Sequence, residues 1–196
     1  MSIGFDAVDV SAAMLAEAAT RCPDHDGRIT WVHAAAEDIR PATRYGLVVA
    51  GESLHWMDWS VVFDWLPGAL VDGGVLALVS GRELGGVPWR ADLAALIPRF
   101  STNTVFTPYD LVDELTTRRL FEERGRLTTT AVPFAQPIEV YVESFHTRNG
   151  FSRERMTADA ASAFDAAVVA MAAPHCPDGC VHGAIAATVV WGTPRA

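Results

Sequence analysis

The sequence predicts an α/β fold with a mostly parallel sheet flanked by helices. Three observations predict it. Short apolar runs alternate with helical segments along the first half of the chain, these runs are rich in β-branched residues, and the run Val75 to Ser80 has no polar alternation. A strand covered by helices on both faces has this unbroken apolar character. The chain has 196 residues, half of them apolar, so we expect residues 1–196 to form one domain.

Four strands and two helical segments are predicted in the first half. Ser11 can cap a helix over Ala12 to Arg21, because its hydroxyl can accept a hydrogen bond from the first turn. A Trp-rich helical segment runs from about Leu54 to Leu70, and Asp72-Gly73-Gly74 forms a turn into the last of the four strands. The strands are predicted over Phe5 to Val10, Ile29 to His33, Tyr45 to Ala50 and Val75 to Ser80.

The second half is less regular in its pattern. Neither an internal repeat nor a low-complexity linker marks a second domain, so residues of about 81–196 are assigned to the same domain as residues of about 1–80. The predicted elements are a loop and helix over Gly85 to Phe100, a helix over Tyr109 to Arg124, a strand over Arg126 to Phe134, a helix over Met156 to Ala173 and a strand over Ala184 to Trp191.

Charge and cysteine content exclude several classes of function. All fifteen basic residues are arginine, and twenty-four acids outnumber them, so the formal charge of -9 would repel a nucleic-acid backbone. The three cysteines are an odd, sparse set typical of a reducing compartment. Neither a signal peptide nor an apolar run long enough to span a bilayer is apparent. We therefore expect a soluble cytoplasmic protein that binds neither nucleic acid nor membrane.

The ends of the predicted strands are the first place to look for a binding site, because open α/β sheets bind ligands outside the carboxyl ends of their strands. Asp9 ends the first strand, where a carboxylate can accept both hydroxyls of a ribose; alternatively, it caps the following turn. Asp38 follows the second strand and can accept from an adenine amino group, beside backbone N–H groups that could contact the ring. The alternative for Asp38 is a solvated loop acid.

Four segments in order resemble class I S-adenosylmethionine (SAM) dependent methyltransferases. The resemblance is closest to the small-molecule group with a His-Trp or Gln-Trp pair after the fourth strand, which includes trans-aconitate methyltransferase-like proteins. It covers residues 5–80 well, and beyond them it rests on the closing strand with its WGTP ending. The segments are VDVSAAML at Val8 to Leu15, AAEDI at Ala35 to Ile39, YGLVVAGESLHWMDW at Tyr45 to Trp59 and LVDGGVLALVS at Leu70 to Ser80.

The resemblance implies a Rossmann-like fold, SAM as the cofactor and a small-molecule methyl acceptor. By the resemblance, Asp9 binds the ribose, Asp38 with Ile39 binds the adenine, and the backbone around Gly51 lies along the methionine portion of SAM. The neighbouring residues Val10 and Glu37 complete the candidate cofactor-binding set. Neither the acceptor nor the oligomeric state follows from the sequence.

The family begins with a strand and a Gly-rich turn of the form D-x-G-x-G, and nothing of that form precedes Asp9. We therefore expect a chain that lacks the family's first strand, which lies between the second and fourth strands of the sheet. Loss of that strand would open the core, weaken folding and weaken SAM binding. A wrongly assigned start codon and a truncated gene would explain this equally well.

Methyl transfer needs an in-line approach to an activated sulfonium and, for some acceptors, a base. His55 is the candidate base nearest the pocket in sequence; alternatively, His55, Trp56 and Trp59 pack the first turn of a helix and shape the acceptor pocket. Trp56, Trp59, Phe63 and Trp65 follow partly helical spacing, which favours core or pocket lining.

Two further alternatives concern a metal and a different cofactor. The cluster His175, Cys176, Cys180 and His182 could suggest zinc, but its tight spacing around a proline and a glycine favours a loop, and we predict no metal site. A nicotinamide-dependent oxidoreductase shares the acid after the second strand, but no G-x-G-x-x-G sequence is present. A non-catalytic, truncated methyltransferase-like domain is the remaining alternative.

Overall fold

The computed structural model describes residues 4–23, 26–81, 86–104 and 109–196. Its contacts group the chain into two compact units. Unit 1 comprises Met1–Val79, Leu111–Arg126 and Val189–Ala196, and unit 2 comprises Ser80–Asp110 and Leu127–Thr188. The chain first passes from unit 1 to unit 2 after Val79, but residues 111–126 and 189–196 belong to unit 1 again, so the units differ from the two halves of the sequence. The single domain over residues 1–196 stays a prediction.

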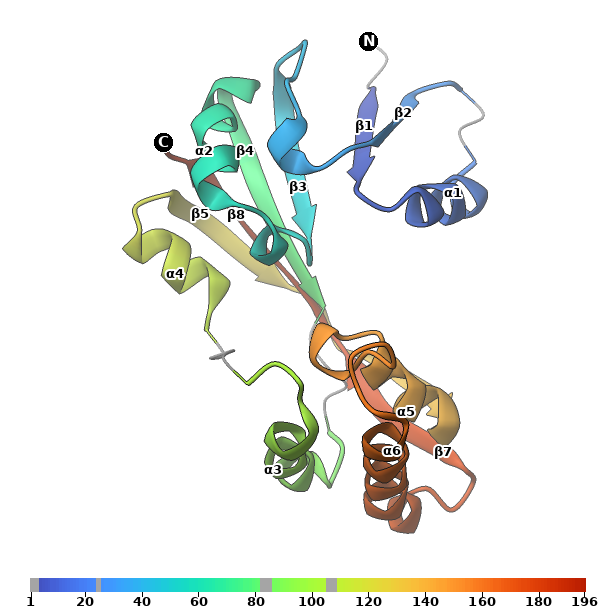
Figure 1. The fold of residues 1–196 in the computed structure, drawn as a ribbon. Helices are drawn as coiled ribbons and strands as arrows, with labels where there is room; N and C mark the ends of the chain where they lie inside the picture. Colours follow the sequence, from blue (N-terminus) through green and yellow to red (C-terminus); the bar gives the residue numbers. More distant parts are fainter. Residues whose placement is uncertain (1–3, 24–25, 82–85, 105–108) are drawn as a thin grey trace. The chain divides into compact units, whose positions relative to one another are not determined.

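Unit 1 contains most of the predicted strands (Figure 1). Its helical elements are α1 (Ala12–Arg21), η1 (Ala36–Asp38), η2 (Leu54–Trp56), α2 (Trp59–Trp65), η3 (Pro67–Ala69) and α4 (Leu111–Thr117). Its strands are β1 (Phe5–Asp9), β2 (Ile29–His33), β3 (Tyr45–Gly51) and the larger parts of β4 (Leu70–Gly81), β5 (Phe121–Thr128) and β8 (Ala187–Pro194). The strands predicted from the first half of the sequence are confirmed within one residue at their ends, except that β4 begins earlier.

The helix that follows β1 begins as the sequence predicts. Ser11 is the N-cap of α1, and its hydroxyl accepts a hydrogen bond from the backbone N–H of Met14 at 3.3 Å. The helix ends at Arg21, the last residue of the predicted range. The prediction is therefore confirmed at both ends.

The strands of unit 1 form two separate sheets. β1 pairs with β2 in parallel, with Phe5 opposite Ile29 and Asp9 opposite His33. The second sheet has the order β3-β4-β8-β5, and β3 is parallel to β4. Within the described residues, β1 and β3 share no strand pairing. The break falls between the two strands where the sequence analysis expects a strand to be missing, and that expectation stays a prediction.

The buried core of unit 1 belongs to the four-stranded sheet alone. Helices α2 and α4 cover this sheet (Figure 1) and contribute Phe63 and Leu115, and Leu66 follows α2 directly; all three are at most 2% exposed. By contrast, residues 4–23 and 26–49 contain no buried side chain. Large apolar residues of β1 and β3 are open to solvent, including Phe5 at 56% and Val49 at 55% exposure. The β1-α1-β2 segment is therefore held without a core of its own.

The predicted helical segment from about Leu54 to Leu70 is confirmed, and it is divided into three short helices, η2, α2 and η3. Asp58 caps α2 with its side chain, which separates η2 from α2, and Pro67 begins η3. The predicted turn at Asp72-Gly73-Gly74 lies inside β4, where Gly73 has φ +80° and the register against β3 shifts. A Cβ on Gly74 would lie 3.0 Å from the carbonyl oxygens of Tyr45 and Val71.

The predicted helix over Tyr109 to Arg124 is correct in its first half and wrong after Thr117. Helix α4 ends at Thr117, and Arg119 takes φ +61°. The N–H of Arg119 then donates to Thr116 O and that of Leu120 to Leu115 O, both at 2.9 Å. This is the Schellman pattern that ends many helices, and glycine usually occupies the left-handed position. Strand β5 starts directly afterwards, so the predicted strand over Arg126 to Phe134 is divided between β5 and β6.

Replacing Arg119 with glycine is expected to raise the free energy of unfolding by about 0.5–1 kcal/mol. The left-handed conformation costs a residue with a Cβ about 1–2 kcal/mol, and the greater backbone entropy that glycine loses on folding offsets part of this gain. Urea unfolding of the wild type and the variant would measure the change. Arg118→Gly is the matched control, because it replaces a neighbouring arginine outside the left-handed position. Equal stabilisation by both substitutions, or a loss at Arg119, would contradict the assignment of this turn.

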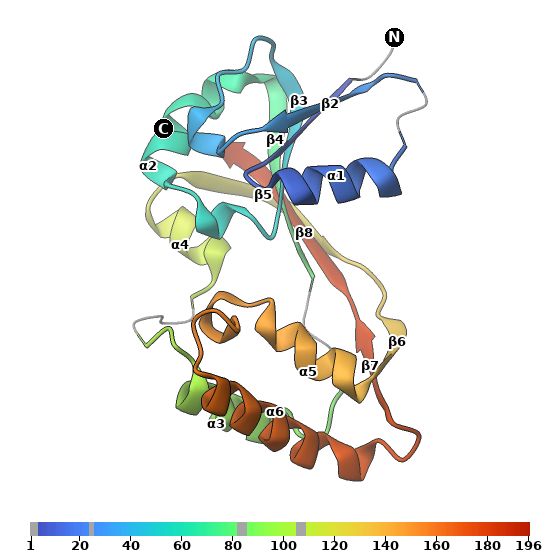
Figure 2. The same ribbon diagram turned by 45° about the vertical axis from the view of Figure 1, so that its right-hand side comes forward.

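Among its described residues, unit 2 contains the β6-β7 sheet and the helices α3, α5 and α6 (Figure 2). Its strands are β6 (Val132–Pro137) and β7 (Cys180–Ile185), which pair antiparallel. Its helical elements are α3 (Arg90–Phe100), α5 (Ile138–His146), η4 (Asn149–Phe151), α6 (Ala158–Ala172) and η5 (Ala173–His175). Helix α5 contacts both strands, and α6 contacts α3 and α5. The predicted closing strand over Ala184 to Trp191 is in fact the end of β7 and the start of β8.

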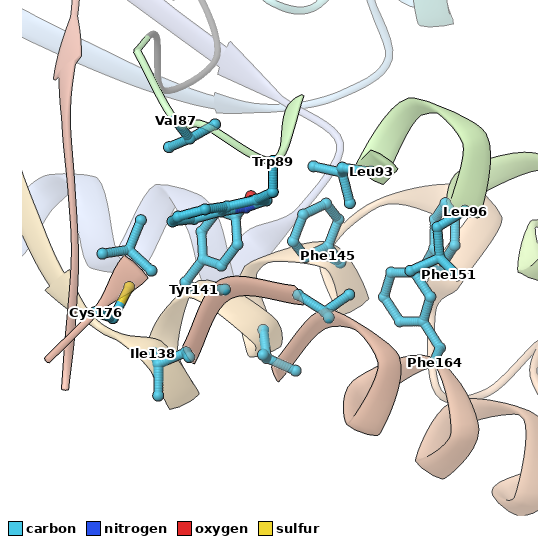
Figure 3. Packing of buried hydrophobic residues seen from close by; sticks show 14 of the residues in the cluster. Val87, Trp89, Leu93, Leu96, Ile138, Tyr141, Phe145, Phe151, Phe164 and Cys176 are labelled. Atoms are coloured by element: carbon cyan, nitrogen blue, oxygen red, sulfur yellow. The ribbon is translucent and has the colours of Figure 1, made fainter. Parts of the chain in front are cut away.

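Aromatic rings form the core of unit 2 (Figure 3). Phe164 of α6 is fully buried, with ring centroids 4.7 Å from Phe151, 5.5 Å from Phe145 and 5.6 Å from Phe100. Trp89 lies at the other side of the cluster and donates its Nε1–H to Tyr141 Oη at 3.3 Å. These contacts tie α3, α5 and α6 to one another.

A buried histidine closes the polar end of this core. The Nδ1–H of His146 donates to the carbonyl oxygen of Phe151 at 2.7 Å, and Nε2 lies 2.6 Å from Oδ1 of Asp165 on α6. Arg153 in turn contacts Asp165 and Glu143, and its proximity lowers the pKa of Glu143. Both ring nitrogens of His146 contact protein oxygen atoms, so this histidine joins α5 to α6 and has no ring nitrogen left to bind a ligand.

Among the described helices, none is long and apolar enough to cross a membrane.

Candidate functional site at the carboxyl ends of β1, β2 and β3

The carboxyl ends of three strands of unit 1 carry the predicted site residues. β1 ends at Asp9, β2 at His33 and β3 at Gly51. β1 and β2 end side by side, because Asp9 and His33 are register partners. The loop after β2 also reaches the segment after β3, because η1 contacts α2. The three strand ends therefore lie within one unit, at the position where open α/β sheets bind ligands.

Asp9 caps the turn that follows β1, which is one of the two roles predicted for it. Its Oδ1 accepts a hydrogen bond from the backbone N–H of Ser11 at 2.7 Å, which stabilises the turn into α1. Within the described part of the chain, its second oxygen, Oδ2, has no protein donor. One carboxylate oxygen thus fixes the side chain, and the other is available to a hydroxyl donor.

His33 is a residue of this site that the sequence analysis did not identify. Its Nε2 donates to the carbonyl oxygen of Val10 at 3.0 Å, and the N–H of Ala34 donates to the carbonyl oxygen of Asp9 at 3.2 Å. Both bonds hold the Asp9-Val10 turn against the end of β2. The side chain of Val10 is 69% exposed, so an apolar surface lies directly beside the Asp9 carboxylate. The only sequence signal for His33 was its place as the last residue of the second strand.

The acidic stretch after β2 forms the short helix η1. The N–H of Asp38 donates to Ala35 O at 3.1 Å, and the N–H of Ile39 donates to Ala36 O at 3.3 Å. The carboxylate of Asp38 is exposed. The Glu37 carboxylate instead accepts from the backbone N–H of Asp58 at 2.7 Å. The three candidate residues therefore differ: Asp38 presents its side chain to solvent, Ile39 is half-buried, and Glu37 is bonded to another loop.

The end of β3 has an unusual backbone. Gly51 is the last residue of the strand, and a Cβ built on it would meet nothing within 4 Å. Glu52 follows with φ +48°, a left-handed conformation that costs a non-glycine residue about 1–2 kcal/mol. Its N–H donates to the carbonyl oxygen of Val79 at 3.0 Å, which holds the turn in place. Backbone strain of this kind concentrates at functional sites, and here it lies beside open space.

The aromatic residues after β3 divide into an exposed pair and a packed residue. His55 and Trp56 are exposed, with ring centroids 4.9 Å apart, and Trp56 is 65% exposed. Trp59 is half-buried; its Nε1–H donates to Leu54 O at 2.8 Å, and the Arg118 guanidinium lies 5.1 Å from its ring. The sequence analysis gave packing against the first turn of the helix as the alternative to a catalytic base. Trp59 packs in this way, whereas His55 and Trp56 are exposed.

The cluster near the carboxyl terminus contains no arrangement of ligands for zinc. Nε2 of His182 lies 2.7 Å from Oδ2 of Asp178, whose pKa is lowered mainly by this hydrogen bond. Cys176 is buried, and burial raises the pKa of its thiol. Over the residues described, no three His, Cys, Asp or Glu side chains come together as a metal site would require. The segment is a turn between η5 and β7, closed by the N–H of Gly179 on Cys176 O at 2.9 Å.

Comparisons with known proteins show which fold this is. Neither a family model nor a curated protein sequence matches the chain. Among solved structures, a protein from Anaeromyxobacter dehalogenans, provisionally assigned as a type II methyltransferase, is 20% identical with a TM-score of 0.55; the match covers 97% of this chain and 79% of that one. SAM-dependent methyltransferases from Geobacter sulfurreducens and Thiobacillus denitrificans, both in complex with S-adenosyl-L-homocysteine (SAH), are 16% and 12% identical with TM-scores of 0.50. Each of these two matches covers 98% of this chain and 76% of the other.

The chain therefore has the Rossmann-like α/β fold of class I SAM-dependent methyltransferases. The fold class predicted from the sequence is confirmed, and the resemblance drawn from four short segments is confirmed at the level of the fold.

Proposed function

We propose that this protein transfers a methyl group from SAM to a small-molecule acceptor. The observation that carries the proposal is the set of strand ends in unit 1: Asp9 with a free carboxylate oxygen, Asp38 with an exposed carboxylate, and the open, strained turn at Gly51-Glu52. In this fold, similar proteins from other organisms hold SAH, the demethylated product of SAM. These residues suit an adenosyl ligand. The two carboxylates can accept from hydroxyl and amino groups, and the turn at Gly51 leaves space for the methionine portion of SAM.

Each candidate residue has a role in this proposal. Oδ2 of Asp9 accepts from the ribose hydroxyls, while Oδ1 remains bonded to Ser11. Val10 gives the adenine ring an apolar surface, Asp38 accepts from its amino group, and Ile39 packs beside it. The backbone at Gly51 lies along the methionine portion. SAM supplies a methyl group already activated on a sulfonium, so the protein's task is to bind and orient the two reactants.

The acceptor side of the site is carried by the exposed His55-Trp56 pair. Trp56 is 65% exposed, so its ring is open to a ligand, and it lies four positions after Glu52 of the strained turn at the end of β3. His55 can act as the base for an acceptor that must lose a proton. An acidic chain with a formal charge of -9 favours a neutral or cationic acceptor over an anionic one.

Replacing Asp9 with asparagine is expected to raise the Kd for SAH by roughly 10–100-fold, since hydrogen bonds to a charged group contribute about 1.5–3 kcal/mol. The amide oxygen of asparagine can still accept from Ser11, so stability should change little. Isothermal titration of SAH would measure the affinity, with Asp26→Asn, an exposed acid of the same unit, as the control. An unchanged Kd would remove Asp9 from the ribose site.

Replacing His55 with asparagine separates its two interpretations. If His55 is the base, transfer of the labelled methyl group of SAM to a panel of small amines and alcohols falls by about 10²-fold or more, while the Kd for SAH stays within a factor of about two. Trp56→Ala is the companion variant, expected to weaken acceptor binding and not SAH binding. Unchanged transfer by His55→Asn would exclude His55 as the base.

A second candidate function is non-catalytic, and one observation favours it. No side chain in residues 4–23 and 26–49 is buried, although this segment supplies Asp9 and Asp38. A cofactor site on such a segment is held by hydrogen bonds and by partly buried contacts such as that of Ala36 with the core. More of its binding free energy is therefore lost to ordering than at a site on a packed scaffold. A folded protein that binds neither SAM nor SAH would contradict methyl transfer and favour this second function.

A further inference from the structure

Glu37 makes a contact that links two loops of the site. It lies in η1 after β2, and its Oε1 accepts a hydrogen bond at 2.7 Å from the backbone N–H of Asp58, at the start of α2. The two residues are 21 positions apart, and η1 and α2 are in contact. Backbone donors at the start of a helix lack partners within the helix, so a carboxylate is well suited to this N–H.

The segment that donates this hydrogen bond is fixed at two points. The Asp58 side chain accepts from the N–H and Oγ–H of Ser60 at 2.9 and 2.6 Å, which lowers the pKa of the Asp58 carboxyl and places Asp58 as the cap of α2. Trp59 bonds back to the carbonyl oxygen of Leu54, whose side chain is 2% exposed in the core. The exposed residues His55 and Trp56 lie between these two fixed points.

Glu37 is the neighbour in sequence of Asp38, the candidate adenine-binding residue. Its neighbour Asp38 presents an exposed carboxylate, while Glu37 holds the loop that carries His55 and Trp56. We propose that Glu37 is a positioning residue that fixes the His55-Trp56 turn relative to Asp38, so that cofactor binding at Asp38 orders the acceptor side. This inference rests on the proposed function, and it gives Glu37 a role through Asp58 in place of direct contact with the cofactor.

Substitutions at position 37 can distinguish a residue that positions the loop from a residue that contacts the cofactor through its negative charge. Glutamine at position 37 keeps a carbonyl oxygen that can accept from Asp58 N–H, but it has no negative charge. Alanine loses both the acceptor and the charge. A positioning residue therefore tolerates glutamine and not alanine, whereas a residue that binds the cofactor through its charge loses function with either substitution.

The first measurement uses the ligand-free protein and does not depend on cofactor binding. Amide hydrogen exchange at Asp58, followed by NMR, should accelerate roughly tenfold in Glu37→Ala and less than about threefold in Glu37→Gln, in line with the loss of one hydrogen bond. Asp38→Asn is the matched control, with exchange at Asp58 unchanged. Equal exchange at Asp58 in wild type and Glu37→Ala would overturn the positioning role.

The second measurement adds SAH as the probe. SAH should slow exchange at the amides of His55 and Trp56 in wild type and Glu37→Gln, and leave it unchanged in Glu37→Ala. The same slowing in Glu37→Ala would overturn the coupling between the two loops. Binding of SAH lost equally in Glu37→Gln and Glu37→Ala would instead establish direct contact with the cofactor. Absence of SAH binding to wild type would overturn the proposed function and the coupling, and leave the exchange result at Asp58 to decide the hydrogen bond.

Discussion

Replacing Phe164 with alanine is expected to lower the free energy of unfolding of the second unit by about 3–5 kcal/mol, the usual cost of removing a fully buried phenylalanine. Phe164 is 0% exposed and contacts three phenylalanine rings, those of Phe100, Phe145 and Phe151. Phe100 comes from α3, Phe145 from α5 and Phe151 from η4, so no single neighbour can move to fill the space. Figure 3 shows Phe145, Phe151 and Phe164. The loss of ring contacts adds to the transfer free energy of the side chain.

Urea unfolding, followed by circular dichroism, would measure the effect of Phe164→Ala. Phe134→Ala is the matched control in the same unit, because Phe134 is 37% exposed and should cost no more than about 1 kcal/mol. A similar loss for the two variants would contradict the assignment of Phe164 as the centre of this core. Phe164→Leu should recover part of the loss, because leucine refills much of the volume.

Replacing Gly192 with alanine is expected to cost about 3 kcal/mol, or to prevent β8 from pairing with β5. A Cβ on Gly192 would lie 2.1 Å from the carbonyl oxygen of Glu122 and 2.7 Å from Cζ of Phe121. The nearest atom belongs to the backbone of the neighbouring strand, which cannot turn aside as a flexible side chain can. Overpacking a buried site usually costs about 1–3 kcal/mol, and a backbone contact lies at the upper end.

Gly46→Ala is the matched control for Gly192→Ala, since a Cβ on Gly46, in β3, meets nothing within 4 Å. Thermal unfolding of both variants and wild type would show the difference. The account predicts a clearly lower Tm for Gly192→Ala and little change for Gly46→Ala. Equal Tm values would mean that β5 and β8 do not approach each other as closely as the structure shows. The WGTP ending that the sequence analysis noted thus contains a glycine required by close packing.

The first half of the fold could be predicted because its signals are local. Ser11 caps a helix, β-branched runs form strands, and glycines mark turns, each through interactions between near neighbours in sequence. Two later elements could not be predicted for the opposite reason. The end of α4 at Arg119 uses arginine where glycine is usual. Helix α5 contains Ile138, Val140, Val142 and two aromatic residues, which favour strands, and its helix follows from packing against β6, β7 and α6.

The candidate site could be predicted in part for a related reason. Asp9, Asp38 and Gly51 were found because ligand sites in parallel sheets occur where strands end, and strand ends are visible in a sequence. The bond between His33 and Val10 and the bond between Glu37 and Asp58 join residues 23 and 21 positions apart. Such contacts depend on how the loops fold in space, which is why the sequence suggested cofactor contact for Glu37 and no role for His33.

We propose that this methyltransferase fold binds SAM at the ends of β1, β2 and β3. The most direct test is isothermal titration of SAM and of SAH into the purified wild-type protein, with NAD as the control ligand and circular dichroism to confirm that the sample is folded. The account predicts micromolar affinity for SAH or SAM and no binding of NAD. No heat of binding from SAM or SAH to a folded sample would contradict it and would leave the non-catalytic function in its place.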